Sequence, residues 1–75
     1  MITTETIGVG TKEDFVALEK ELSAARIDYS TYFEDYDPTP WNAIVTAHPG
    51  RIRNVLRELD GRRIYYETTM TLPMA

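Results

Sequence analysis

The sequence of 75 residues contains no cysteine and only one histidine, His48. The absence of cysteine excludes disulfides, thiolate metal sites, iron–sulfur clusters and thiol nucleophiles. A zinc site made from several Cys and His ligands is excluded as well. A chain this short has a thin core, so its stability must come from packing alone or from a partner. A homodimer is also compatible with so small a core.

Long apolar runs are also missing, since no stretch approaches the ~20 apolar residues that a membrane span needs. The segment 1–5 has neither the basic nor the apolar region of a secretory signal. We therefore expect a soluble, cytoplasmic protein with no membrane association. At 43% apolar residues the composition favours a globular fold, and the length favours one domain over 1–75, with 71–75 as a loose tail.

Two segments show helical spacing. Apolar residues at Phe15, Leu18 and Leu22 predict a helix over about 12–25, with Thr11 as its N-cap. The set Ile52, Val55, Leu56 and Leu59 predicts a second helix over about 49–60, with Pro49 in its first turn and Gly61 just past its end.

Four segments rich in β-branched and aromatic residues predict strands at about 2–9, 27–36, 41–47 and 62–71. The segment 37–40, Asp-Pro-Thr-Pro, predicts a hairpin loop between the second and third strands. The order predicts an α+β fold, the ferredoxin-like β-α-β-β-α-β plait, in which two helices cover one face of a four-stranded antiparallel sheet. The first strand is irregular because Ile2 and Ile7 differ in parity, which indicates a bulge or an unpaired start and leaves the side of Glu5 open.

Charge is uneven along the chain. Residues 1–37 carry nine acidic and three basic side chains (−6), and residues 38–75 carry three acidic and five basic ones (+2), giving the net charge of −4. The densest acidic cluster lies among aromatic residues, which are the usual anchors of protein interfaces. We therefore predict a surface that binds a basic partner, formed by Tyr32, Glu34, Asp35, Tyr36, Asp37 and Trp41. A second interpretation is that these charges protect an exposed sheet edge.

Other chemistry is weakly supported. The acidic cluster lacks the spacing of a calcium loop, so neither a metal nor another cofactor is predicted. RNA-recognition domains of this topology carry stacking aromatics on their central strands, whereas segment 2–9 has none, and the overall acidity also disfavours direct nucleic-acid binding. His48 is expected to be a loop or capping residue, and Gly8-Val9-Gly10 a capped turn rather than an anion site.

The small size, the acidity and the acid-aromatic cluster of residues 32–41 resemble stand-alone inhibitors encoded by phages and mobile elements, including anti-CRISPR proteins. This resemblance implies an inhibitor that occupies a basic, nucleic-acid-binding surface of a larger protein or nucleoprotein complex, in the host cytoplasm if a phage encodes it. The element order also resembles ACT-type regulatory modules, which implies a dimeric small-molecule sensor with a ligand near Gly8–Gly10. A small enzyme would need His48 or Asp35 as its base, and neither has a visible partner, so no enzymatic activity is predicted.

Overall fold

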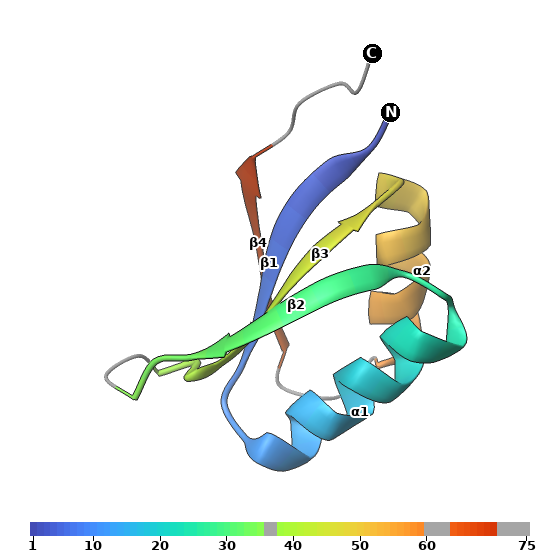
Figure 1. The fold of residues 1–75 in the computed structure, drawn as a ribbon. Coiled ribbons are helices and arrows are strands. Elements are labelled where there is room, and N and C mark those ends of the chain that lie inside the picture. Colours follow the sequence, from blue (N-terminus) through green and yellow to red (C-terminus); the bar gives the residue numbers. More distant parts are fainter. Residues whose placement is uncertain (36–37, 60–63, 71–75) are drawn as a thin grey trace.

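The chain folds as an antiparallel sheet packed against two helices (Figure 1). The computed structural model describes residues 1–35, 38–59 and 64–70, the last of these as backbone only. Three strands form the sheet in the order β1-β3-β2, with β1 at Thr3–Val9, β2 at Asp28–Phe33 and β3 at Trp41–Ala47. The backbone of β4 (Ile64–Met70) pairs antiparallel with the other side of β1. The predicted α+β class and the β2-β3 hairpin are confirmed.

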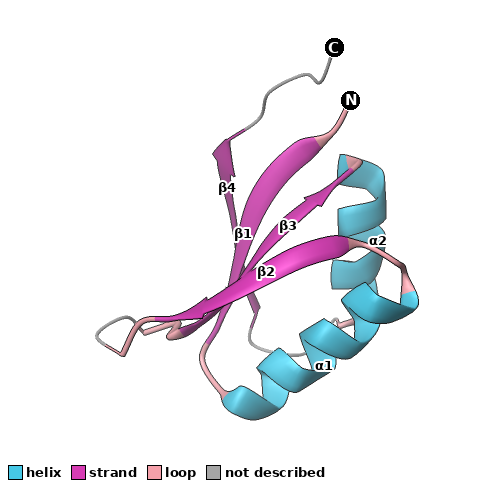
Figure 2. Cartoon of the chain, in the orientation of Figure 1, coloured by secondary structure: helices cyan, strands magenta, loops and turns pink. Residues whose placement is uncertain are grey.

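The two helices lie on one face of the sheet (Figure 2). Helix α1 spans Lys12–Ala24 and begins at the predicted cap, where the Asp14 N–H donates to Thr11 Oγ1 at 3.1 Å. Helix α2 spans Pro49–Glu58, and its N-cap is His48, whose Nδ1 accepts from the Gly50 N–H at 3.1 Å. The capping role predicted for His48 is confirmed. The predicted role of Gly61 lies outside the described residues.

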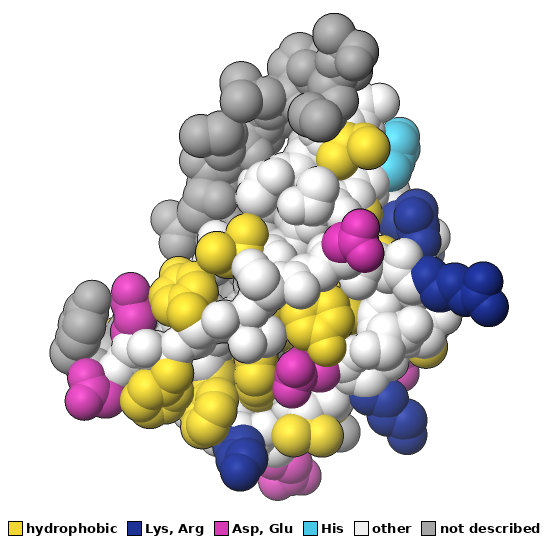
Figure 3. Space-filling model, in the orientation of Figure 1, with side chains coloured by type: hydrophobic (Ala, Val, Ile, Leu, Met, Phe, Trp, Pro, Cys, Tyr) yellow, Lys and Arg dark blue, Asp and Glu magenta, His cyan; other side chains and the backbone are white. Residues whose placement is uncertain are grey.

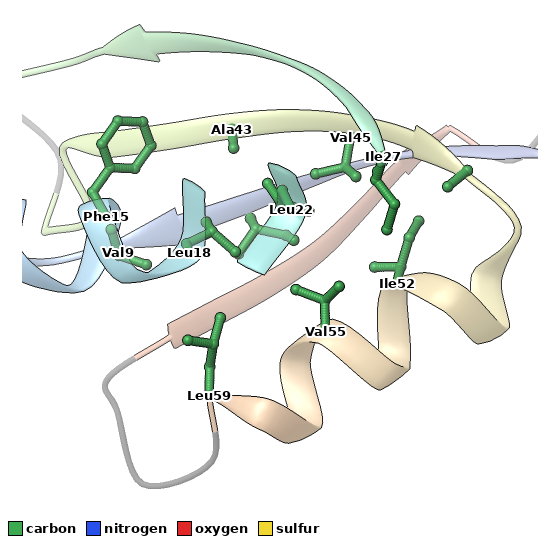
Figure 4. Packing of buried hydrophobic residues seen from close by; sticks show 12 residues of the cluster. Val9, Phe15, Leu18, Leu22, Ile27, Ala43, Val45, Ile52, Val55 and Leu59 are labelled. Carbon is green, nitrogen blue, oxygen red and sulfur yellow. The ribbon is translucent and has the colours of Figure 1, made fainter. Parts of the chain in front are cut away.

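The core lies between the sheet and the helices (Figure 4). Helix α1 contributes Phe15, Leu18 and Leu22, and α2 contributes Ile52 and Val55. The sheet contributes Ile7 and Val9 from β1 and Ala43, Val45 and Ala47 from β3. The alternation of these strand residues leaves the other face of the sheet open, where Thr4 Oγ1 lies 3.3 Å from Thr46 Oγ1.

Glu5 shares the covered face of β1 with Ile7 and is only 3% exposed. The sequence leaves its side undecided, and the answer follows from the parity of Ile7 and Val9, which places odd-numbered residues of β1 inward. Ile2 precedes the strand and is exposed. The register of β1 against β3 runs without interruption from Thr3 to Val9, so of the two predicted alternatives the unpaired start is the one observed. A register shift is present between β1 and β4, where the step from Thr4 to Thr6 opposes a longer step on β4.

Candidate functional site

Three aromatic rings form a cluster that leads from the core to the surface. Phe15, on α1, is 7% exposed and lies 5.5 Å from the ring of Trp41. The ring of Phe33 also contacts the indole, with its centroid 4.8 Å away and edge-on at 65°, and Phe33 is 54% exposed. This geometry is typical of attractive aromatic pairs. The cluster therefore holds a large exposed ring on an indole that is itself fixed against the core.

Phe33 lies on the helix-covered face of β2, because it is paired with Trp41 and contacts it. Phe33 is nevertheless exposed because it ends β2, the outer strand next to β3, where α1 does not cover it. Alternation predicts the face of a residue, but it does not predict how far a helix extends over that face.

The two described aromatic residues of the predicted site lie on opposite faces of the sheet. Trp41 is paired with Phe33 on the helix-covered face. Tyr32 precedes Phe33 on β2, and successive side chains of a strand alternate, so Tyr32 points to the open face. Tyr32 is 39% exposed there. One flat partner surface therefore contacts either Trp41 and Phe33 or Tyr32, but not both sets.

Of the four predicted site residues in the segment 34–37, the structure describes Glu34 and Asp35. The Glu34 N–H donates to the Pro40 carbonyl at 2.9 Å, which continues the hairpin one step past Phe33, and Glu34 is half-buried. Asp35 is exposed. Tyr36 and Asp37 lie outside the described residues.

We call Phe33, Glu34, Asp35 and Trp41 the β2 end surface. In Figure 3 hydrophobic side chains gather over the end of β2 and the start of α1, with acidic side chains at the adjoining tip. Most of the Lys and Arg side chains visible in that view lie on the opposite side, over the helices. The surface therefore combines apolar area with negative charge.

The segment that leads into Trp41 is fastened to the sheet. Asn42 is buried, and its Nδ2 donates to the carbonyls of Thr39 and Pro40, both at 3.1 Å. The Thr39 side chain lies over Gly8, where a Cβ would come within 2.8 Å of Thr39 Oγ1. Because Gly8 has no side chain, this segment packs closely on the sheet. The space beside Gly8 is thus filled by the protein itself.

The two candidate bases of an enzyme do not form one site. Asp35 lies near the Trp41 end of β3, and His48 follows its other end at Ala47. A strand of this length separates them by about 20 Å, at roughly 3.3 Å per residue. Within residues 1–35, 38–59 and 64–70, no three potential ligands are grouped so that they could hold a metal ion.

An open groove of about 330 Å³ lies between α1 and α2. It is lined by the apolar residues Ala24, Ala25 and Val55 and the polar residues Glu21, Arg51, Asn54 and Glu58. The Arg51 guanidinium donates to the Ala25 carbonyl, so it closes the C-terminal end of α1. The groove lies at the opposite end of α1 from Gly8–Gly10.

Comparison with known protein families, with curated proteins and with solved structures found no match. Among the described residues, no helix is long and apolar enough to cross a membrane. The function is therefore inferred from the site alone.

Proposed function

We propose that this protein is a small acidic binding module that docks on a basic surface of a larger protein or nucleoprotein complex through its β2 end surface. The observation that carries the proposal is Phe33, an aromatic side chain that is 54% exposed yet held at 4.8 Å against Trp41. A ring that is already fixed loses little conformational freedom on binding, and aromatic residues of this kind dominate interface energies.

The adjoining acids define the partner. Asp35 is exposed and Glu34 half-buried beside the aromatic pair. Complementary charges at the margin of an apolar contact accelerate association and select the partner. We therefore infer a partner with a basic surface around an apolar pocket, and its capture should weaken as salt screens these charges.

A protein partner fits the surface better than a nucleic acid does. Trp41 lies on the helix-covered face, and on the three strands whose side chains are described the open face carries one aromatic residue, Tyr32. Bases stack on several rings of an open sheet face in RNA-recognition domains. An inhibitor of a nucleic-acid-binding complex, of the phage or mobile-element class that includes anti-CRISPR proteins and acting in the cytoplasm, is the specific form of the proposal.

The complete fold belongs to the same proposal. We infer that the whole chain forms a ferredoxin-like plait, supported by the backbone pairing of β4 with β1. The alternative function, an ACT-like sensor, draws its support from the groove between α1 and α2 rather than from Gly8–Gly10. A sensor would melt at a higher temperature when an amino acid or nucleotide is added, by mass action.

The experiment is affinity capture from the native host with four variants of the chain as bait. Phe33→Ala and Asp35→Lys remove the proposed anchor and reverse the proposed charge. Ile2→Ala, at another exposed apolar residue, and Glu58→Lys, with the same charge change on α2, are the matched controls. We expect a protein with a basic surface to be captured by the controls and lost with both test variants. Equal capture by all four baits would refute the assigned surface.

A further inference from the structure

Strand β2 has one side that is paired with β3 and one side that the sheet order leaves at the edge. The Glu34 N–H donates to the Pro40 carbonyl, which fixes the direction of the backbone groups along β2. Backbone groups alternate in direction along an antiparallel strand, so even-numbered residues of β2 bond to β3. The N–H and C=O groups of Tyr29, Thr31 and Phe33 therefore point away from the sheet.

This edge has few of the features that prevent pairing with another strand. Natural edges carry lysines, prolines or frequent charges. Between Asp28 and Glu34 the strand has only uncharged residues, and its middle residues, Ser30 and Thr31, are exposed. The sequence suggests that the acidic residues of segment 34–37 protect the edge of the second strand. Because β2 ends at Phe33, these residues come after the strand and do not lie along its edge.

The charges beyond the two ends of the edge are opposite in sign. Arg26 precedes the strand and is exposed, and Glu34 follows it. Arg26 also has a positive φ of 57°, a conformation that favours glycine. Glycine would adopt this conformation at a lower conformational free energy than arginine does. The presence of arginine there therefore suggests that its side chain has a function.

We propose that a second copy of this chain pairs antiparallel with β2, centred on Ser30. In this register Tyr29 of each copy exchanges backbone hydrogen bonds with Thr31 of the other, and Arg26 of each copy comes beside Glu34 of the other. Outward groups must face outward groups, so the two neighbouring registers are centred on Tyr29 and on Thr31. The register centred on Thr31 places Asp28 opposite Glu34, and like charges directly opposite are unfavourable. The register centred on Tyr29 places Arg26 opposite Tyr32, so it loses the pairing of Arg26 with Glu34.

The dimer contact and the β2 end surface share Glu34, but different variants test them. The pairing uses the backbone of Tyr29 and Thr31 and the charges of Arg26 and Glu34, whereas the capture experiment changes the side chains of Phe33 and Asp35. The two-fold axis stands perpendicular to the sheet, so the helices of both copies cover the same face of one continuous sheet. Failure of the dimer therefore does not affect the capture experiment, and the reverse also holds.

The first test is the mass in solution, by light scattering after size exclusion. The wild-type chain should elute at about twice its 8.6 kDa at high concentration. Thr31→Pro removes an N–H that points away from β3, so it should give a folded monomer, with folding checked by circular dichroism. A wild-type monomer at the highest soluble concentration, or a Thr31→Pro dimer, would overturn the proposal.

The second test uses charge exchange and does not depend on a proline. Arg26→Glu and Glu34→Arg should each raise the dissociation constant, because each places like charges together. An equimolar mixture of the two variants should recover the dimer. The Arg26→Glu chain is acidic at positions 26 and 34, and the Glu34→Arg chain is basic at both, so opposite charges face each other in the mixed dimer. Arg53→Glu, at an exposed residue of α2, is the control with the same charge change and should remain dimeric. No recovery in the mixture would contradict the register.

The third test is cross-linking, which is clean because the chain has no cysteine. Opposed Ser30 residues form a non-hydrogen-bonded pair with Cα atoms about 4.5 Å apart, within disulfide range. Ser30→Cys should therefore cross-link rapidly under mild oxidation. Thr31→Cys should cross-link slowly, since the two Thr31 positions are diagonal neighbours at about 7–8 Å. Faster cross-linking of Thr31→Cys would refute the proposed register.

Discussion

Arg26 follows Ala25, the C-cap of α1, and forms the turn that closes this helix. Its N–H donates to the Ser23 carbonyl at 3.1 Å, and the Ile27 N–H donates to the Leu22 carbonyl at 3.0 Å. These two bonds, with a left-handed residue between them, are the Schellman motif that closes many helices. Leu22 and Ile27 are both buried, which supplies the apolar contact that accompanies the motif. The turn is thus strongly determined even though its left-handed residue is not glycine.

Arg26→Gly should stabilise the monomer by about 1 kcal/mol, because glycine adopts a positive φ without the steric cost of a Cβ. The measurement is urea unfolding followed by circular dichroism, carried out under monomeric conditions. Arg26→Ala is the control, which keeps the Cβ and should change the free energy of unfolding little. The proposed dimer uses the Arg26 side chain, so both variants should weaken self-association. Arg26→Gly should therefore raise the stability of the monomer while it lowers the affinity of the dimer. An Arg26→Gly chain less stable than Arg26→Ala would contradict the backbone argument.

The hairpin of β2 and β3 is the element that positions the β2 end surface. Its second half is held by the bonds from Asn42 to the carbonyls of Thr39 and Pro40 and by the close approach of Thr39 to Gly8. Trp41 follows directly, so the indole that supports Phe33 starts from a fixed backbone. The three strands whose side chains are described act together in placing this surface.

Gly8→Ala should destabilise the fold by about 1–3 kcal/mol, because the added Cβ displaces a side chain in a closely packed region. Its nearest neighbour is Thr39 Oγ1 at 2.8 Å. Trp41 is the only tryptophan of the chain, so its fluorescence reports the shift at the hairpin directly. Gly10→Ala is the matched control, since its Cβ would meet the Pro38 carbonyl oxygen at an ordinary 3.5 Å. Equal spectra and stabilities for the two variants would show that Gly8 is not a packing position.

Most elements could be predicted from the sequence because their signals are local. Strand β3 has the predicted bounds 41–47, and both helices begin at the predicted residue. The sequence predicts that β2 reaches 36, whereas the strand ends at Phe33, because Pro40 has no N–H to return the bond from Glu34. That limit depends on the pairing of the two strands, which the sequence of one strand does not contain.

The candidate site could be predicted only in part, for a related reason. The sequence places Tyr32 and Trp41 near each other, but the register that pairs Trp41 with Phe33 sends Tyr32 to the open face. The exposure of Phe33 likewise depends on how far α1 extends. The composition of the sequence therefore predicts which segment forms the surface. The register of the strands determines which side chains lie on the same face, and composition does not contain that information.

The molecule as a whole is stabilised by one thin core. Leu18 and Leu22 of α1 and Ile52 of α2 are fully buried against a single face of the sheet. For a chain of 75 residues the expected free energy of unfolding is roughly 4–11 kcal/mol. A single large cavity can therefore remove much of the stability.

Leu18→Ala should lower the free energy of unfolding by about 2–5 kcal/mol, the usual cost of deleting a buried leucine side chain. Val16→Ala, on the exposed side of the same helix, is the control and should cost less than about 0.5 kcal/mol. Urea unfolding of both variants gives the comparison. Similar losses for the two would mean that α1 packs with a different face.

The central claim is that this small acidic molecule binds its partner through the β2 end surface. The most direct measurement is the dissociation constant of the captured partner for Phe33→Ala against the wild type, with Ile2→Ala beside them. We predict at least about tenfold weaker binding for Phe33→Ala, as expected for an interface anchor, and unchanged binding for Ile2→Ala. Equal dissociation constants for all three chains would contradict the claim.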